Sequence, residues 1–234
     1  MSALFRWPEA GRVDRVIPKE RLYAEGAVTG PDRRRLVDQV QRIRWAYKLG
    51  EKSVRLGPSD AVAEIQVFEI ELKDSSLDDT VLASIDRSIP SPIVFELRRD
   101  DGLWVEQAMA AASQQAGARK PKVSEYFRTG WIGPDADRSP LPPALDLEGL
   151  YGLLLGSLFP HSMRPGEKLS EGIDRMTSVR RLEREVSALS KRVRLEAQFN
   201  RKVELRRDLR ARHVELDALT NPEERSAEDA TWRS

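Results

Sequence analysis

The chain has 234 residues, with 39 lysines and arginines against 38 aspartates and glutamates, so its formal net charge is +1. This balance excludes attraction of the whole molecule to nucleic acid or to a membrane, and any basic patch must be local. The chain has no cysteine and two histidines, His161 and His213. A disulfide scaffold, thiolate catalysis and cysteine-bound zinc are therefore excluded.

No segment of the sequence has the character of a membrane span or a secretory signal. The stretch MSALFRWPEAGRVDRV at 1–16 contains acidic residues and no apolar core. The most apolar run, at 147–159, has 13 residues, and a bilayer requires about 20. We therefore expect a cytoplasmic protein with no membrane contact.

Two helices are predicted near the start of the chain. Residues 18–25 begin with Pro18, which suits the first position of a helix. Residues 31–48 begin with Pro31, carry apolar side chains at a spacing near 3.6 residues and end before Gly50. We interpret both segments as helices.

The pattern then changes to one that is typical of strands. Residues 62–73 are rich in β-branched and aromatic side chains and predict a strand, and residues 76–90 predict a helix. Residues 92–99 and 103–112 predict an antiparallel pair because an Asp-Asp-Gly turn joins them. A further strand is expected at 122–132.

A proline-rich stretch at 133–143 divides the predicted organisation. We expect an α+β body over 1–143, an apolar helix plus a charged helical or coiled-coil arm over 144–220, and a flexible tail over 221–234. The body is expected to be a mostly antiparallel sheet flanked by helices.

The predicted arm carries an apolar seam with the spacing of a coiled coil. Its side chains step by three and four residues, and they are Val179, Leu182, Val186, Leu189 and Val193. The seam fails at Glu196 and resumes out of phase at Leu205, within EAQFNRKVEL at 196–205. This break indicates either a stutter in one helix or the elbow of a helical hairpin.

Six sequence blocks occur in order along the chain. They are IPKERLY (17–23), RIRWAYKL (42–49), AEIQVFEIELK (63–73), IDRSIPSPIVFEL (85–97), LPPALDLEGLYGLLL (141–155) and EAQFNRKVEL (196–205). Together they resemble the bacterial domain of unknown function DUF4391. The resemblance implies a role beside DNA-acting machinery, since members are encoded near helicases and DNA methyltransferases in defence or restriction-modification islands. The chain departs from the family at 108–115, which reads AMAAASQQ where members carry a Tyr-Lys-Arg run.

The arm also holds the first set of candidate site residues. Between Arg180 and Arg212 there are 12 lysines and arginines against 5 acidic residues. The candidates for binding a protein partner are Leu182, Val186, Leu189, Phe199 and Asn200. The candidates for binding nucleic acid phosphates are Arg201, Lys202, Arg206, Arg207 and Arg210. In the alternative interpretation, Phe199 packs on the seam and Asn200 fixes the register of a plain packing arm.

A second candidate site lies on the predicted strand at 62–73. Asp60, Glu71 and Lys73, joined by Glu96 from the next strand, have the residue types of a Mg²⁺-dependent nuclease of the PD-(D/E)xK kind. Two carboxylates would hold the metal ion and the lysine would orient or activate water. A solvated ladder of glutamate and lysine on one strand face explains the same pattern without a function.

The leading hypothesis is a non-catalytic accessory or scaffold subunit of a bacterial DNA-directed defence complex, either anti-phage or restriction-modification. Such a subunit would bind a helicase or DNA methyltransferase, or a second copy of itself, through the helical arm and would need no cofactor. Two alternatives remain open: the Mg²⁺-dependent nuclease, and a nucleic-acid-binding protein.

Overall fold

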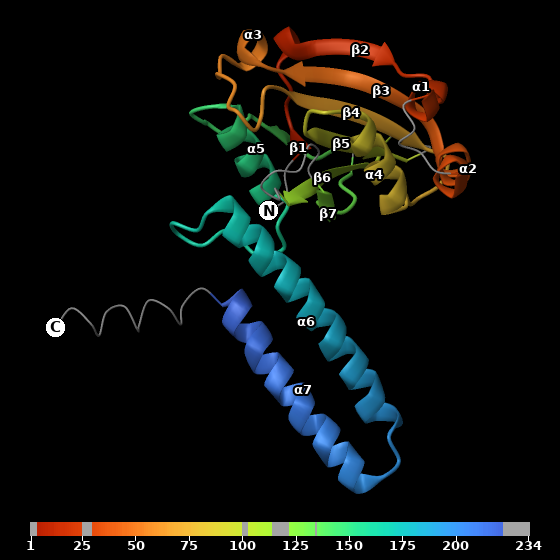
Figure 1. Cartoon of the computed structure of the whole chain (residues 1–234), viewed down its shortest axis with the longest axis vertical. Helices are drawn as coiled ribbons and strands as arrows, with labels where there is room; N and C mark the ends of the chain where they lie inside the picture. The colour runs from red at the N-terminus through yellow and green to blue at the C-terminus, as the bar shows by residue number, and fades with distance from the viewer. Residues whose placement is uncertain (1–3, 25–29, 100–102, 114–121, 134, 222–234) are drawn as a thin grey trace, which may run out of the picture. The chain divides into compact units, whose positions relative to one another are not determined.

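The chain forms two compact units, residues 1–159 and residues 160–234, and each is described by itself (Figure 1). The structure is a computed structural model that describes residues 4–24, 30–99, 103–113, 122–133 and 135–221. The predicted tail at 221–234 lies outside these residues except for Asn221.

The first unit is built on a six-stranded sheet. In spatial order its strands are β2 (Arg12–Val16), β3 (Val40–Leu49), β4 (Ile65–Leu72), β5 (Ile93–Arg98), β6 (Val105–Ser113) and β7 (Lys122–Arg128). Neighbouring strands are antiparallel except for β4 and β5, which run parallel because helix α4 (Asp79–Ser88) returns the chain between them. The predicted α+β class with a mostly antiparallel sheet is therefore confirmed.

The remaining short elements of this unit lie around the sheet. They are the parallel pair β1 (Leu4–Phe5) and β8 (Arg138–Ser139), the 3-10 helix η1 (Glu9–Gly11), and helices α1 (Lys19–Ala24), α2 (Gly30–Gln39), α3 (Glu51–Val54) and α5 (Leu147–Gly156).

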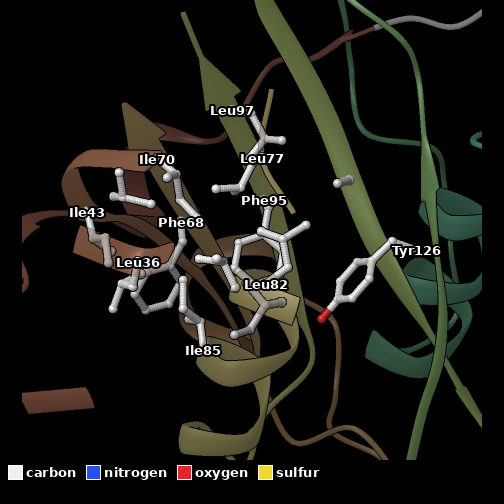
Figure 2. Packing of buried hydrophobic residues seen from close by; sticks show 14 of the residues in the cluster. Leu36, Ile43, Phe68, Ile70, Leu77, Leu82, Ile85, Phe95, Leu97 and Tyr126 are labelled. Atoms are coloured by element: carbon white, nitrogen blue, oxygen red, sulfur yellow. The ribbon is translucent and has the colours of Figure 1, made fainter. Parts of the chain in front are cut away.

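Helices α2 and α4 cover one face of the sheet and enclose its main hydrophobic core (Figure 2). Leu36 of α2 and Leu82 of α4 are buried with Phe68 of β4 and Phe95 of β5. Each such side chain contributes about 1.5–3 kcal/mol through the apolar surface that it removes from water. The alternation along β4 supplies this face with Phe68, Ile70 and Leu72.

The predicted helix at 31–48 is wrong in its second half, where the chain forms strand β3. Strand β3 pairs with β2 on one side and β4 on the other, and its register with β4 shifts at Val40/Arg42 and at Trp45/Tyr47. Each shift adds one residue to β3, so that Val40, Ile43, Ala46 and Leu49 are buried at a spacing of three. A spacing of three is also typical of the apolar side of a helix. The segment forms a strand because it pairs with two strands that are distant in sequence.

Helix α5 belongs to the first unit rather than to the arm with which it was grouped in the prediction. The hydroxyl of Tyr151 donates to the carbonyl oxygen of Ala110 in β6 at 2.8 Å, and the amide of Leu147 donates to the carbonyl of Gly57 at 3.1 Å. The predicted boundary at 143 therefore precedes the division between the units. Within the ranges that the structure describes, each helix is too short or too polar to cross a membrane.

The second unit consists mainly of helices α6 (Leu169–Leu195) and α7 (Phe199–Thr220), which form a hairpin (Figure 1). Residues 196–198 form its elbow, so the structure selects the hairpin over the stutter. Leu182 of α6 and Leu205 of α7 are buried, and Arg212 reaches across from α7 to Glu185 of α6 at 3.1 Å.

Candidate functional site: the hairpin tip and the polar face of the sheet

The predicted nuclease residues do not come together in the structure. Glu71 and Lys73 lie at the carboxyl end of β4, whereas Asp60 lies in the exposed loop that leads into its amino end. The eight steps along the chain from Ile65 to Lys73 correspond to about 26 Å of extended strand. Asp60 is thus at the opposite end of the strand from the other two residues.

Lys73 is engaged in holding the end of helix α2. Its ammonium group donates to the carbonyl of Val37 at 2.7 Å, and its backbone amide donates to the carbonyl of Gln39 at 2.9 Å. The ammonium group of Lys19 donates to the carbonyl of Val40, the first residue of β3, at 2.5 Å. Burial, followed by the charge of Lys73, lowers the pKa of Lys19. Two cations at the negative end of a helix stabilise that end, so Lys73 and Lys19 have a structural role here.

The carboxylates on the polar face of the sheet are paired with arginines. Glu71 lies 3.2 Å from Arg42 and 4.0 Å from Arg44, both of which belong to β3. Glu69 lies 3.3 Å from Arg98 of β5. These pairs are partly exposed, and each contributes less than about 1 kcal/mol. They form the ladder of opposite charges that the sequence left open as the alternative to a nuclease.

Glu96 is the centre of a buried polar cluster, which we call the polar centre. Arg138 donates to both carboxylate oxygens of Glu96, at 2.7 and 3.0 Å. The indole of Trp7 donates at 2.7 Å, and the side-chain amide of Gln107 at 3.1 Å. Burial would raise the pKa of Glu96, but Arg138 and the other donors outweigh it and lower the pKa below its usual value.

The polar face therefore lacks the features of a metal site. The oxygens of Glu96 are occupied by donors from three different segments of the chain, and Glu69 and Glu71 face cations. Among the described residues there is no group of three or more carboxylates or histidines placed to hold a metal ion.

The elbow of the hairpin has a different surface, which we call the hairpin tip and define as Leu195, the elbow residues 196–198 and Phe199. The side chain of Leu195 is 83% exposed and that of Phe199 is 76% exposed. The two residues lie at helix ends, since α6 terminates at Leu195 and α7 begins at Phe199. Large apolar side chains this exposed are typical of binding sites when they occur together.

The structure changes the predicted set of partner-binding residues. Phe199 and Asn200 are exposed, but Leu182 is only 2% exposed and Val186 and Leu189 are half-buried along the hairpin. These three side chains pack within the chain because the second helix folds back on the first. The sequence analysis missed Leu195. It could have been found as an apolar residue that lies off the seam and directly before the break in the seam.

Positive charge is concentrated in the half of the hairpin near the tip. From Lys191 to Arg210 there are 8 lysines and arginines against 3 acidic residues. Of the predicted phosphate-binding residues, Arg201 lies 3.6 Å from Glu196, and Lys202 is half-buried. Within the described ranges, the other three form no ion pair and are exposed; they are Arg206, Arg207 and Arg210.

These features define an α+β protein with an appended helical hairpin whose tip exposes apolar side chains and whose adjoining half carries an excess of basic residues. The chain belongs to the family described as Domain of unknown function (DUF4391), whose model matches residues 5–216. The match covers nearly the whole chain and both units, and it agrees with the resemblance of the six sequence blocks. No curated protein and no solved structure matches the chain.

Proposed function

We propose that this chain is a non-catalytic accessory subunit of a bacterial DNA-directed defence complex, anti-phage or restriction-modification. It binds a helicase or DNA methyltransferase of the same system through the hairpin tip. The single observation that carries the binding site is the exposure of Leu195 and Phe199 at the elbow. The resemblance to a family encoded near such enzymes supports the choice of partner.

The tip provides the apolar anchors that protein interfaces require. Transfer of Phe199 and Leu195 from water into a pocket of the partner would contribute about 1.5–3 kcal/mol for each side chain. A few such anchors commonly supply most of the binding free energy of an interface. The surrounding arginines would orient the tip on the partner and accelerate its approach.

The seam is not available for the same purpose. Leu182 and Leu205 are buried, so the apolar stripe of the hairpin is already covered by its own second helix. Pairing with a second copy through this stripe would require the hairpin to open. Binding at the tip leaves the hairpin intact and therefore needs no such rearrangement.

Co-purification tests this function directly. The chain is co-expressed with a candidate helicase or DNA methyltransferase, and the affinity of the complex is measured by titration. The double substitution Leu195→Ala and Phe199→Ala should weaken binding by about 100-fold or more, corresponding to about 3 kcal/mol.

A matched control is Leu145→Ala, because Leu145 is 98% exposed but lies in the first unit. This variant should bind as the unchanged chain does. Full affinity in the double variant, or an equal loss in the control, would contradict binding at the tip.

A further inference from the structure

Helix α7 carries a second exposed surface, which we call the outer face of α7. It consists of Phe199, Val203, Arg206, Arg210 and Val214, which step by four, three, four and four residues. At 100° per residue these positions fall within an arc of about 80° and extend over about 22 Å of helix. Val203 is 49% exposed and Val214 is 69% exposed.

The outer face is distinct from the seam that joins the two helices. The residues of α7 that turn toward α6 include Leu205, which is buried, and Leu209 and Leu216, which are half-buried. These positions lie roughly 100–140° around the helix from the centre of the outer face. Its valines therefore do not complete the packing of the hairpin, and they form an additional apolar stripe.

The charges on this face are of one sign over most of its length. Arg206 and Arg210 lie between the two valines, and Arg207 lies beside them; in the part of the chain described here, none of the three has an ionic partner. By contrast, Arg212 on the other side of α7 pairs with Glu185 and Glu215. Asp217 and His213 are the other titratable groups on this side, and both lie toward the C-terminal end.

From this arrangement we propose that the outer face of α7 binds an acidic amphipathic helix of the partner protein. The inference rests on the proposed function and specifies which kind of surface the partner presents. Apolar side chains of the incoming helix pack on Phe199, Val203 and Val214, and its carboxylates lie opposite Arg206 and Arg210. Side chains at i, i+4 and i+7 are the usual anchors when two helices pack.

Charge and apolarity together favour this occupant over two others. A second copy of the chain would place Arg206 and Arg210 against the same arginines, and like charges in an interface are repulsive. A nucleic acid would satisfy the arginines, but its phosphates would leave the three apolar side chains without a partner. An acidic amphipathic helix satisfies both kinds of side chain.

The absence of cysteine from the chain allows a direct test. A single Val214→Cys substitution carries a photo-crosslinker in the co-purified complex, and the crosslinked segment is sequenced by mass spectrometry. The expected product is a partner segment rich in glutamate and aspartate, with apolar residues three and four positions apart. Ala211→Cys is the control, because Ala211 is exposed on the same helix but lies about 100° around it from the centre of the outer face.

Crosslinking to any other target would overturn the inference. Such targets are a second copy of the chain, the segment 222–234 of the same chain, a nucleic acid, or a partner surface without acidic character. A crosslink that forms equally well from Ala211→Cys, or no crosslink from Val214→Cys, would have the same consequence.

A charge reversal separates this inference from the function on which it rests. Arg206→Glu with Arg210→Glu should weaken the complex by about tenfold or more and reduce its dependence on salt. The matched control is Arg181→Glu with Arg184→Glu, an equal change on exposed positions of α6. If the tip variant loses the partner but the Arg206/Arg210 variant does not, the proposed function stands and the acidic helix is excluded. If neither variant loses it, both proposals fail.

Discussion

The polar centre depends on a buried charge that is balanced by a distant residue. Glu96 is 1% exposed, and the guanidinium of Arg138 reaches it across 42 positions of sequence. The desolvation of such a carboxylate is costly unless cations and hydrogen-bond donors compensate for it. Arg138 supplies two of these donors and also donates to the carbonyl of Phe5 at 2.7 Å, which joins the start of the chain to the sheet.

Removal of Arg138 should therefore destabilise the first unit strongly. Arg138→Met retains most of the apolar stem but removes both hydrogen bonds of Arg138 to the buried Glu96 and leaves Arg98, 3.6 Å away, as the remaining cation. We expect a loss of about 3 kcal/mol in the free energy of unfolding. Urea titration followed by tryptophan fluorescence measures this loss. Arg42→Met removes a largely exposed partner of Glu71 and should cost less than about 1 kcal/mol. Equal losses in the two variants would refute the role of the polar centre.

A second buried carboxyl makes the stability of the first unit depend on pH. The hydroxyl of Tyr126 donates to Asp86 of helix α4. Burial raises the pKa of Asp86 to about 7, against smaller opposing effects of Tyr126 and Arg87. The folded state therefore holds a proton that the unfolded chain releases near its ordinary pKa of 3.8. This contribution to stability is complete below about pH 4 and declines as the pH rises to about 7.

Asp86→Asn should abolish this decline. The amide stays neutral and its oxygen still accepts from Tyr126, so the variant should gain about 2 kcal/mol relative to the unchanged chain between pH 5 and pH 8. The expected gain in stability is roughly half of the value that the full pKa shift of Asp86 implies, because part of the Asp86 residue reaches solvent. Chemical denaturation at the two pH values gives the difference. A constant gap between the two proteins would show that Asp86 ionises normally.

At the scale of elements, local sequence patterns predicted those helices and strands whose formation depends mainly on residues close together in the sequence. Strand β4, helix α4 and the β5–β6 pair lie inside the predicted ranges or within one residue of them. Strand β3 could not be predicted in this way, because two irregularities in its pairing convert the alternation of a strand into a spacing of three. The short strands β1 and β8 pair across more than 130 residues, and neither carries a local signal.

The sequence predicted the seam and its break, because the seam is local to each helix, but left open whether the break is a stutter or the elbow of a hairpin. The stability of the hairpin should depend on that seam and not on the exposed side of α7. Leu205→Ala should cost about 2–3 kcal/mol, since Leu205 is buried, whereas Val214→Ala should cost less than about 0.5 kcal/mol. The rates of amide hydrogen exchange in α6 and α7 measure the difference in stability between the two variants. A loss of about 1.4 kcal/mol corresponds to a tenfold faster exchange. Similar protection in the two variants would mean that the seam does not hold the helices together.

At the scale of the whole molecule, the two units differ in how their arginines are used. In the sheet unit, arginines pair with Glu69, Glu71 and Glu96, whereas along α7 Arg206, Arg207 and Arg210 have no ionic partner among the described residues. The sequence predicted candidate binding residues at the break in the arm, and Phe199 is exposed there. It did not predict that the seam residues would pack against the second helix of the same chain, because the spacing of an apolar seam does not indicate which helix will cover it.

The purified chain should show no Mg²⁺-dependent cleavage of DNA. Conversion of supercoiled plasmid to nicked or linear forms measures such activity, with Glu71→Gln and Lys73→Ala prepared in parallel. All three proteins should behave alike, because Glu71 faces arginines and Lys73 is bonded to the end of α2. Cleavage that disappears in both variants would restore the nuclease hypothesis.

The pairing of β1 with β8 has a consequence for synthesis on the ribosome. Leu4 and Phe5 are synthesised before the six-stranded sheet, yet they pair with Arg138 and Ser139, which are added after it. A nascent chain that ends after β7 contains Glu96 and Arg98 but lacks Arg138, which binds both carboxylate oxygens of Glu96. Completion of the sheet unit is thus coupled to translation of the segment beyond β7, and premature termination there should yield a species that chaperones and proteases recognise as unfinished.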